Sequence, residues 1–257
     1  YGAVFGEQRF LDDHGVLGDL VGEGYRALAL TRRGFVFVRE NGQIITHGRD
    51  IPKRLLDVIR KVELTNDRID VLAIGTGDRF YVRCQSGVQY AFGSDDFIEI
   101  LTNEEAVSRV HHVAFGPEFD SWVVIWENGS VAFEGVHDLL RSVLSDTRIM
   151  PILSSVALSP DRSSVFCVFY SNGRTVLNSV PREVKEAHSK YGIRSGFIGY
   201  REIDSKKPPP FVLGMERGEG EEKEMNNDEQ WCDALLSHDA AAANRAECRQ
   251  ERTSGSI

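Results

Sequence analysis

The stretch SWVVIWENGSVAFEG, residues Ser121–Gly135, contains two short apolar segments separated by Glu-Asn-Gly. Asparagine and glycine accept the positive φ values of a two-residue type I′ turn, so the stretch predicts a β-hairpin that turns at Asn128 and Gly129. Residues 122–126 are apolar on both faces of the predicted first strand. Such a strand is expected to be covered on both sides, as between packed sheets, and not on one side alone.

The pattern of an aromatic residue seven positions before a turn glycine occurs five times in the chain. The pairs are Phe35 and Gly42, Phe80 and Gly87, Trp122 and Gly129, Phe166 and Gly173, and Phe211 and Gly218. Successive glycines are 45, 42, 44 and 45 residues apart. Repeats of this length are typical of propellers and stacked arrays. We therefore predict five equivalent units, with their turn glycines around one pseudo-five-fold axis.

Each unit is predicted to contain three strands and a helix. A further apolar segment precedes the hairpin at residues 27–30, 71–75, 113–117 and 156–160. An i, i+3, i+4 apolar pattern follows the hairpin at residues 51–61, 136–146 and 180–190, and a shorter one at residues 95–101. Pro52 and Pro181 occupy first-turn positions of two of these helices, where a missing N–H is tolerated.

The two ends of the chain each hold part of one unit. Tyr1–Gly6 matches a third strand and residues 9–20 match the helix, whereas residues 197–200 and Phe211–Gly218 match the first and second strands. We therefore expect Tyr1–Gly6 to pair with Phe211–Gly218. The predicted fold is mainly β with helices: a five-bladed β-propeller-like ring of βββα repeats over residues 1–218, closed by N- and C-terminal half-repeats.

The repeat combines an aliphatic-Ala-aliphatic-Gly/Ser-Pro segment, an aromatic-Val-x-x-aromatic-x-Asn-Gly segment and a Leu-rich helix opened by Pro. This pattern resembles WFVRYSDG-type repeats of predicted fungal, amoebal and oomycete proteins. The resemblance covers residues 1–218 and is strongest in Val113–Leu140, although Phe37, Ala91 and Leu177 replace tryptophans of the pattern. It implies a propeller-like or related ring fold that often lies beside signalling or interaction modules. No established activity and no site residue come with it.

A five-fold ring of the amidinotransferase type is the alternative architecture. Its catalytic members resemble one another in a Cys, His and acidic set at a central site, whereas Cys84 and Cys167 of this chain lie within apolar strands. The four cysteines, Cys84, Cys167, Cys232 and Cys248, form no CxxC pair, so neither a zinc site nor a disulfide framework is expected. Buried thiols are typical of a reducing compartment, which predicts a cytoplasmic location.

The net charge of −9 is unevenly distributed, with −6 in residues 219–257 and −3 in residues 1–218. No block of lysine and arginine indicates nucleic-acid binding. No segment approaches the roughly 18 apolar residues of a membrane span. Residues 219–257 are predicted to be an acidic tail, partly disordered, with a short helix formed within Trp231–Glu251.

Several short motifs have a structural interpretation that is preferred to a chemical one. They are His111-His112, the glycine-rich GTGDRF at Gly75–Phe80, the glycosylation triplet Asn128-Gly129-Ser130, Asp12-Asp13-His14 and the Pro-rich KKPPP at Lys206–Pro210. None brings together a nucleophile and a base, a metal-ligand set or a complete phosphate loop. No catalytic, cofactor-binding or metal residue is therefore predicted.

The sequence favours a protein-binding or scaffold module without catalysis. Repeat rings present loops from every unit on one face, which gives a wide contact surface. A protein partner is expected. The alternative is a carbohydrate-binding, lectin-like propeller with one pocket per repeat, and an enzyme ranks third because no cofactor or reacting pair is indicated.

Overall fold

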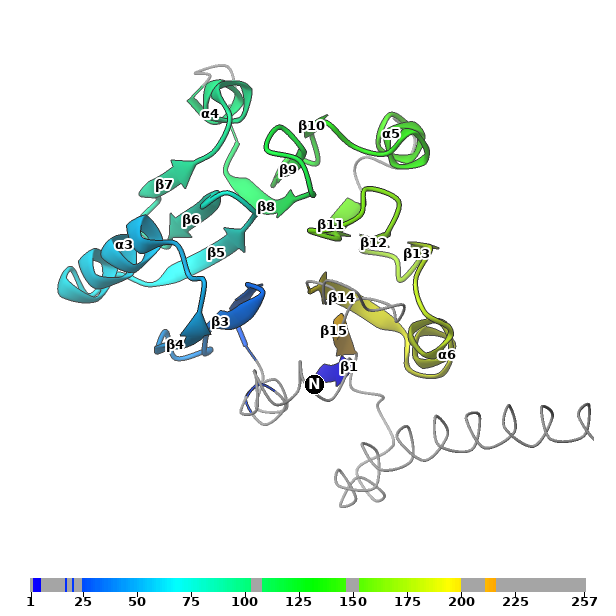
Figure 1. Cartoon of the computed structure of the whole chain (residues 1–257), viewed down its shortest axis with the longest axis horizontal. Helices are drawn as coiled ribbons and strands as arrows, with labels where there is room; N and C mark the ends of the chain where they lie inside the picture. Colours follow the sequence, from blue (N-terminus) through cyan, green and yellow to red (C-terminus); the bar gives the residue numbers. More distant parts are fainter. Residues whose placement is uncertain are drawn as a thin grey trace, which may run out of the picture. The chain divides into compact units, whose positions relative to one another are not determined.

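The computed structural model describes residues 2–5, 17, 20, 25–102, 108–146, 153–199 and 211–215, whose elements are labelled in Figure 1. The chain divides into two compact units, Tyr1–Glu216 and Arg217–Ile257. All the described residues belong to the first unit. The predicted acidic tail, residues 219–257, lies outside the described residues.

The described strands form five three-stranded antiparallel sheets, here numbered along the chain. The first sheet is β2 (Ala27–Leu30), β3 (Arg33–Val38) and β4 (Ile44–Arg49), and the second is β5 (Ile69–Ile74), β6 (Phe80–Cys84) and β7 (Gln89–Phe92). The third is β8 (Val110–Phe115), β9 (Trp122–Trp126) and β10 (Val131–Glu134), and the fourth is β11 (Leu153–Leu158), β12 (Phe166–Tyr170) and β13 (Thr175–Asn178). The fifth is β14 (Ile193–Ile198), β15 (Phe211–Met215) and β1 (Gly2–Phe5). The protein is therefore mainly β with few helices.

The five repeated aromatic residues occupy the same place in their sheets. Each stands on the middle strand opposite the last residue of the first strand; the pairs are Leu30 and Phe35, Ile74 and Phe80, Phe115 and Trp122, Leu158 and Phe166, and Ile198 and Phe211. All residues of β6, β9 and β12 are buried. The predicted repeat register and the two-sided burial of the middle strand are both confirmed.

The predicted pairing of the two ends is also confirmed. β1 runs antiparallel to β15, with Gly2 opposite Gly214 and Phe5 opposite Phe211. The first strand of this sheet, β14, begins four residues earlier than predicted. The reason is that Gly192 adopts a left-handed conformation and ends the preceding helix, so the chain extends from residue 193 onward.

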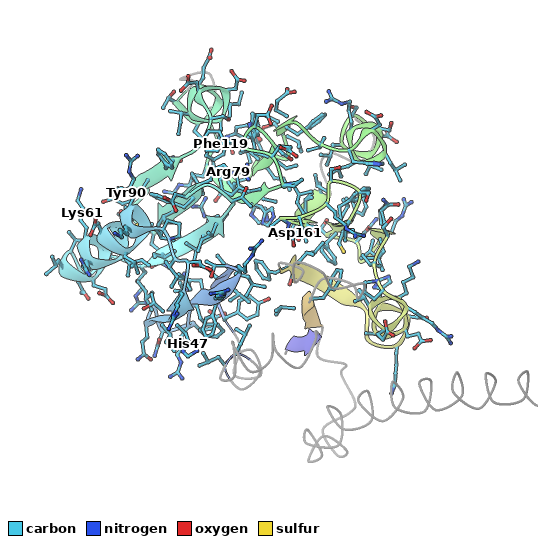
Figure 2. All side chains as sticks on the ribbon, viewed as in Figure 1. His47, Lys61, Arg79, Tyr90, Phe119 and Asp161 are labelled. Atoms are coloured by element: carbon cyan, nitrogen blue, oxygen red, sulfur yellow. The ribbon has the colours of Figure 1, made fainter. Side chains whose placement is uncertain are left out.

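The helices follow the third strands of the first four sheets: α3 (Lys53–Leu64), α4 (Asp95–Thr102), α5 (Asp138–Leu144) and α6 (Arg182–Tyr191). Pro52 and Pro181 have extended ψ angles of 129° and 158°, so they are N-cap residues and not first-turn residues as predicted. α3 also contacts β7, because Lys61 Nζ lies 5.1 Å from the ring centre of Tyr90 (Figure 2). Of the helix predicted at residues 9–20, only Leu17 and Leu20 are described; both are helical and buried.

The hairpin turns differ from the prediction. In the third sheet the N–H of Gly129 bonds to the Trp126 carbonyl, and the N–H of Trp126 bonds to the Ser130 carbonyl, which makes a three-residue loop. Only the glycine has positive φ, at 82°, so the turn is type I followed by a glycine bulge and not type I′. Asn128 serves a different purpose: its Oδ1 accepts from the N–H of Ser130. Gly42, Gly87 and Gly173 make the same loop, and Gly218 lies outside the described residues.

The sheets pack in sequence, and the succession returns from the fifth to the first. Their first strands contact one another in the order β2, β5, β8, β11 and β14, and β14 contacts β2. Five apolar clusters fill the boundaries between neighbouring sheets. The cluster between the fifth and first sheets contains Val212 with Leu28, Phe35 and Phe37. The middle strands β6, β9 and β12 are therefore covered on both faces, whereas the third strands β4, β7 and β10 remain partly exposed.

Candidate binding surfaces

The two ends of the strands carry different side chains. We call the end where the first strands begin and the hairpin glycines lie the turn end. The opposite end, with the loops between the first and second strands and the starts of the helices, is the loop end. In the second and third sheets the loop end consists of residues 75–79, 93–96, 116–121 and 134–139. A hydrogen bond from Thr76 Oγ1 to the Pro117 carbonyl, 3.1 Å long, joins the two sheets there.

Arg79 organises the loop end of the second and third sheets. Its side chain is completely buried. Nε donates to the Thr76 carbonyl, Nη1 to the Phe119 and Ser121 carbonyls, and Nη2 to Thr76 Oγ1 and the Gly116 carbonyl, at distances of 2.7–3.1 Å. All five N–H donors of the guanidinium are thus used. One side chain fixes the conformation of the loop that follows β8.

Phe119 is the aromatic side chain that this loop presents to solvent. Its side chain remains 48% exposed. Its carbonyl is held by Arg79, its ring centre lies 5.7 Å from the guanidinium carbon, and the neighbouring sticks can be followed in Figure 2. Gly77 also lies close to the Phe119 ring. Its φ is 65°, and a Cβ added at this glycine would lie 3.2 Å from the ring. The exposed ring is therefore held in place from beneath.

The exposed charges of these four segments have one sign. They are Asp78, Asp95, Asp96, Glu118, Asp120, Glu134 and Asp138. Asp95, Asp96 and Asp138 also lie in first turns of helices, where a carboxylate interacts favourably with the helix dipole. Arg79 is the basic residue of the segments, and it is buried. The loop end of the first sheet is mainly basic, because Arg33, Arg49, Lys53 and Arg54 are exposed there with one carboxylate, that of Asp50.

At the turn end, the first strands of the second to fifth sheets share a β-bulge. The register shifts at Asp70, His111, Ser154 and Arg194, and Arg26 occupies the equivalent place in the first sheet. Bulges re-aim side chains and are frequent beside functional sites. At these positions a polar residue stands at the start of the first strand, and the rest of that strand is mostly apolar.

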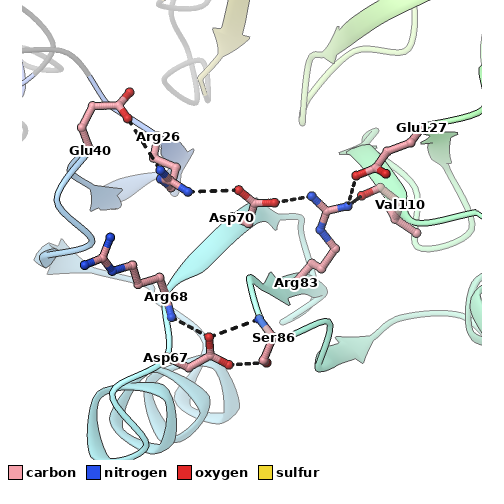
Figure 3. A network of polar contacts seen from close by, with 9 residues as sticks. All are labelled: Arg26, Glu40, Asp67, Arg68, Asp70, Arg83, Ser86, Val110 and Glu127. Atoms are coloured by element: carbon pink, nitrogen blue, oxygen red, sulfur yellow. Dashed lines mark hydrogen bonds and ion pairs between the residues drawn. The ribbon is translucent and has the colours of Figure 1, made fainter.

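A chain of ion pairs crosses three sheets at this end (Figure 3). Arg26 of the first sheet lies 3.4 Å from Asp70 of the second, Asp70 pairs with Arg83, and Arg83 donates to Glu127 of the third sheet at 2.9 Å. Burial opposes the charge of Arg83, but the hydrogen bonds and charges of Asp70 and Glu127 outweigh it and raise its pKa. The network therefore connects the first, second and third sheets.

The two adjacent histidines separate into different roles. His111 is exposed at the bulge, whereas His112 Nε2 lies 2.7 Å from the Val156 carbonyl of the fourth sheet. Burial is the main cause that lowers the pKa of His112 to about 4. The ring is therefore neutral at pH 7, with its proton on Nε2. Among the described residues, no group of three His, Cys, Asp or Glu side chains could hold a metal ion.

The remaining candidate motifs are distributed as follows. GTGDRF is the β5–β6 loop around Arg79, and Asn128-Gly129-Ser130 is the β9–β10 turn. Burial raises the pKa of Cys84 to about 11 and that of Cys167 to about 12, so both are protonated thiols at neutral pH. In the described part of the chain, no helix is both long and apolar enough to cross a membrane. Asp12, Asp13, His14, Lys206–Pro210, Cys232 and Cys248 lie outside the described residues.

The role of Arg79 was not predicted, although the repeat alignment holds a signal for it. The residue before the middle-strand aromatic is Gly34, Ser121 or Val165 in the other described copies, and each of these is buried. A charged residue at a position that is buried in the other described copies must find internal partners. Arg79 is the charged residue among these four equivalent positions. This difference in the alignment is the signal that could have predicted its buried hydrogen bonds.

Comparison with known proteins adds little. No family model and no curated protein shows a significant match to the sequence. Among solved structures, the C-terminal domain of gp131 from bacteriophage phiKZ is similar with a TM-score of 0.36 and 11% identity. The match covers 63% of this chain and 53% of the phage domain, so this chain spans about half the length of that domain.

Proposed function

We propose that residues 1–218 form a five-bladed propeller-like module that binds a partner protein and performs no catalysis. The five sheets with equivalent registers, the succession of contacts that returns to the first sheet, and the pairing of β1 with β15 support this architecture. The resemblance to WFVRYSDG-type repeats belongs to the same proposal, since such segments occur beside interaction modules.

The main support for a binding function is the loop end of the second and third sheets, where the loop conformation is fixed by side-chain hydrogen bonds. A fully buried arginine donates three hydrogen bonds to backbone carbonyls of a loop whose Phe119 ring stays half exposed. A rigid aromatic side chain can bind a partner with little loss of conformational entropy, which is why such residues dominate protein interfaces. The fold therefore keeps an apolar ring at the surface in a fixed position.

The chemistry of the described residues favours binding over reaction. Both described cysteines are buried thiols with raised pKa values, which makes them poor nucleophiles. His112, the histidine with a strongly lowered pKa, uses Nε2 to bind the Val156 carbonyl of a neighbouring sheet. These groups maintain the contacts between sheets.

Affinity purification tests the proposal. The intact chain and its Phe119→Ser variant are each immobilised, incubated with lysate of the source organism, and compared by quantitative mass spectrometry. Leu64→Ser is the matched control, because Leu64 is also an exposed apolar residue, at 87%, but lies at the end of α3. We expect at least one protein to be recovered by the intact chain and the control and depleted with Phe119→Ser. Equal recovery by all three, or no enrichment over beads alone, would contradict the proposal.

A further inference from the structure

We infer that the loop end of the second and third sheets binds a basic, partly apolar segment of the partner protein, with Phe119 as the central contact. The inference rests on the proposed function and specifies the chemistry of the partner. It depends on three observations: a fixed exposed ring, exposed charges of one sign around it, and a second exposed apolar residue on the same rim.

The first observation concerns the position of the ring. Phe119 is held at its carbonyl by Arg79 and from beneath by Gly77, while almost half of its side chain is exposed. Its inner side already lies near the Arg79 guanidinium. The outer face is therefore available to an aliphatic side chain or to a second cation, since the face of an aromatic ring attracts positive charge.

The second observation concerns the surroundings of the ring. Glu118 and Asp120 adjoin Phe119 in the sequence, and Asp78 lies on the facing loop between Gly77 and Arg79. The exposed charged residues of the four segments are all acidic, and the exposed Arg162 of the fourth sheet lines a small cavity beside Gly116 and His137. Fixed charges of one sign around an apolar contact select partners of the opposite sign and accelerate their association.

The third observation widens the surface. Leu139, at the start of α5, is 46% exposed, and the chain before it approaches the Phe119 loop, because a Cβ added at Gly135 would lie 3.0 Å from the Asp120 carbonyl. Glu134 and Asp138 stand on the same segment. The surface therefore alternates apolar and acidic groups, which matches a segment in which lysine or arginine alternates with leucine or an aromatic residue.

The charges also argue against the chain's own C-terminal segment as the occupant. Residues 219–257 carry a net charge of −6, so this surface would repel them. A second copy of the chain could offer the basic loop end of its first sheet. We commit to a partner protein because a basic segment can contact both Phe119 and Leu139, and self-association is an outcome of the test.

The test selects ligands without prior choice of sequence. A library of random phage-displayed peptides is panned against the intact chain, and enriched peptides are synthesised with a fluorescent label and titrated by fluorescence anisotropy. We expect the enriched peptides to combine Lys or Arg with Leu or aromatic residues. Phe119→Ser, and separately the isosteric triple variant Asp78→Asn, Glu118→Gln and Asp120→Asn, are expected to weaken binding at least tenfold, about 1.4 kcal/mol.

Two control variants make the result specific. Leu64→Ser removes an exposed apolar side chain, and Asp57→Asn removes an exposed carboxylate of α3, both outside the four segments. Binding should be unchanged in both. Raising the salt concentration should weaken binding of the intact chain and affect the triple variant less, since screening acts on the charges that the variant lacks. Circular dichroism verifies that every variant is folded.

The outcomes separate the inference from the proposed function. If enriched peptides bind all variants equally, or carry no excess of basic residues, the inference is wrong although the module still binds peptides elsewhere. If no peptide is enriched and the affinity purification also recovers nothing, both are wrong. If sedimentation of the protein alone shows a dimer that the triple variant abolishes, the occupant is a second copy and the inference is overturned.

Discussion

The boundary between the second and third sheets and the boundary between the third and fourth are built on the same repeat, yet different chemistry holds each of them. Arg79 at the loop end and Arg83 at the turn end bridge the former, whereas the ring of His112 bonds to the Val156 carbonyl across the latter. An arginine keeps its charge at any ordinary pH, but a histidine does not. Equivalent boundaries in a repeat can thus respond differently to the same conditions.

The apolar clusters of the two boundaries should contribute equally to the free energy of unfolding. Substitutions within them are expected to cause the largest losses of stability. Trp122 belongs to the cluster between the second and third sheets and Phe166 to the cluster between the third and fourth, and both are buried. Trp122→Ala and Phe166→Ala should each reduce the free energy of unfolding by roughly 3–5 kcal/mol. Denaturant melts measure this, and a loss below about 1 kcal/mol for either one would mean that its boundary is not a packed core.

Arg79→Met should come next, at about 3 kcal/mol, since it removes all donors from five buried or partly buried acceptors while conserving much of the side-chain volume. Arg79→Lys should recover little of the loss, because an ammonium cannot reproduce the planar set of donors. The comparison of both variants in urea melts is informative: full recovery by lysine would show that charge, and not geometry, is what the site requires.

The third-to-fourth boundary should depend on pH. The pKa of His112 is about 4 in the folded protein, below the value of about 6.5 of an unperturbed histidine, so the unfolded chain binds the proton more readily. The stability that this histidine contributes is therefore complete above about pH 6.5 and is lost as the pH falls toward 4, by roughly 1–3 kcal/mol.

His112→Gln provides the control, because a glutamine amide can donate to the Val156 carbonyl without titrating. We expect the difference in melting temperature between the variant and the natural chain to shift in favour of the variant between pH 7 and pH 4.5. Arg79→Met should change stability by the same amount at both pH values. A pH-independent difference for His112→Gln would show that the two boundaries do not differ in their response to protons.

The smallest effect is expected at the turn end. Arg83→Met removes a buried guanidinium that pairs with Asp70 and Glu127 and donates to the Val110 carbonyl, but the two carboxylates keep 31% and 46% of their side-chain exposure and can be solvated. The loss should be about 1 kcal/mol, since both carboxylate partners stay in contact with solvent, and it should shrink in high salt. A loss as large as that of Arg79→Met, measured in the same urea series, would place the principal bridge at the turn end instead.

The regular features of the fold were predictable because burial imposes them on the sequence. The five aromatic residues from Phe35 to Phe211 must meet the last residue of each first strand, so their spacing records the register. The match of Tyr1–Gly6 to a third strand predicted its pairing with β15 for the same reason. Apolar periodicity reports which positions are covered, and here that was sufficient.

The turns, the bulges and the loop-end surface were less accessible. Asn-Gly is compatible with a type I′ turn and with a type I turn followed by a glycine bulge; the two differ by one residue in the loop, which composition does not resolve. The bulges at Asp70 and His111 leave no apolar signature. The surface around Phe119 depends on Arg79, a residue whose partners are mostly backbone carbonyls, and these look alike in every sequence.

The antiparallel pairing of β1 with β15 determines when the fifth sheet can form during protein synthesis. Gly2 and Gly214 are partners, so 214 − 2 gives a separation of 212 residues along the chain. At a translation rate of about 5–20 residues per second, β1 is synthesised roughly 10–40 s before its partner. During that interval the first four sheets can form from neighbouring segments, while the fifth cannot be completed. Among the described strands, β15 is therefore synthesised last, and it pairs with β1, which is synthesised first. The contact between the fifth and first sheets can be completed only after β15 has been made.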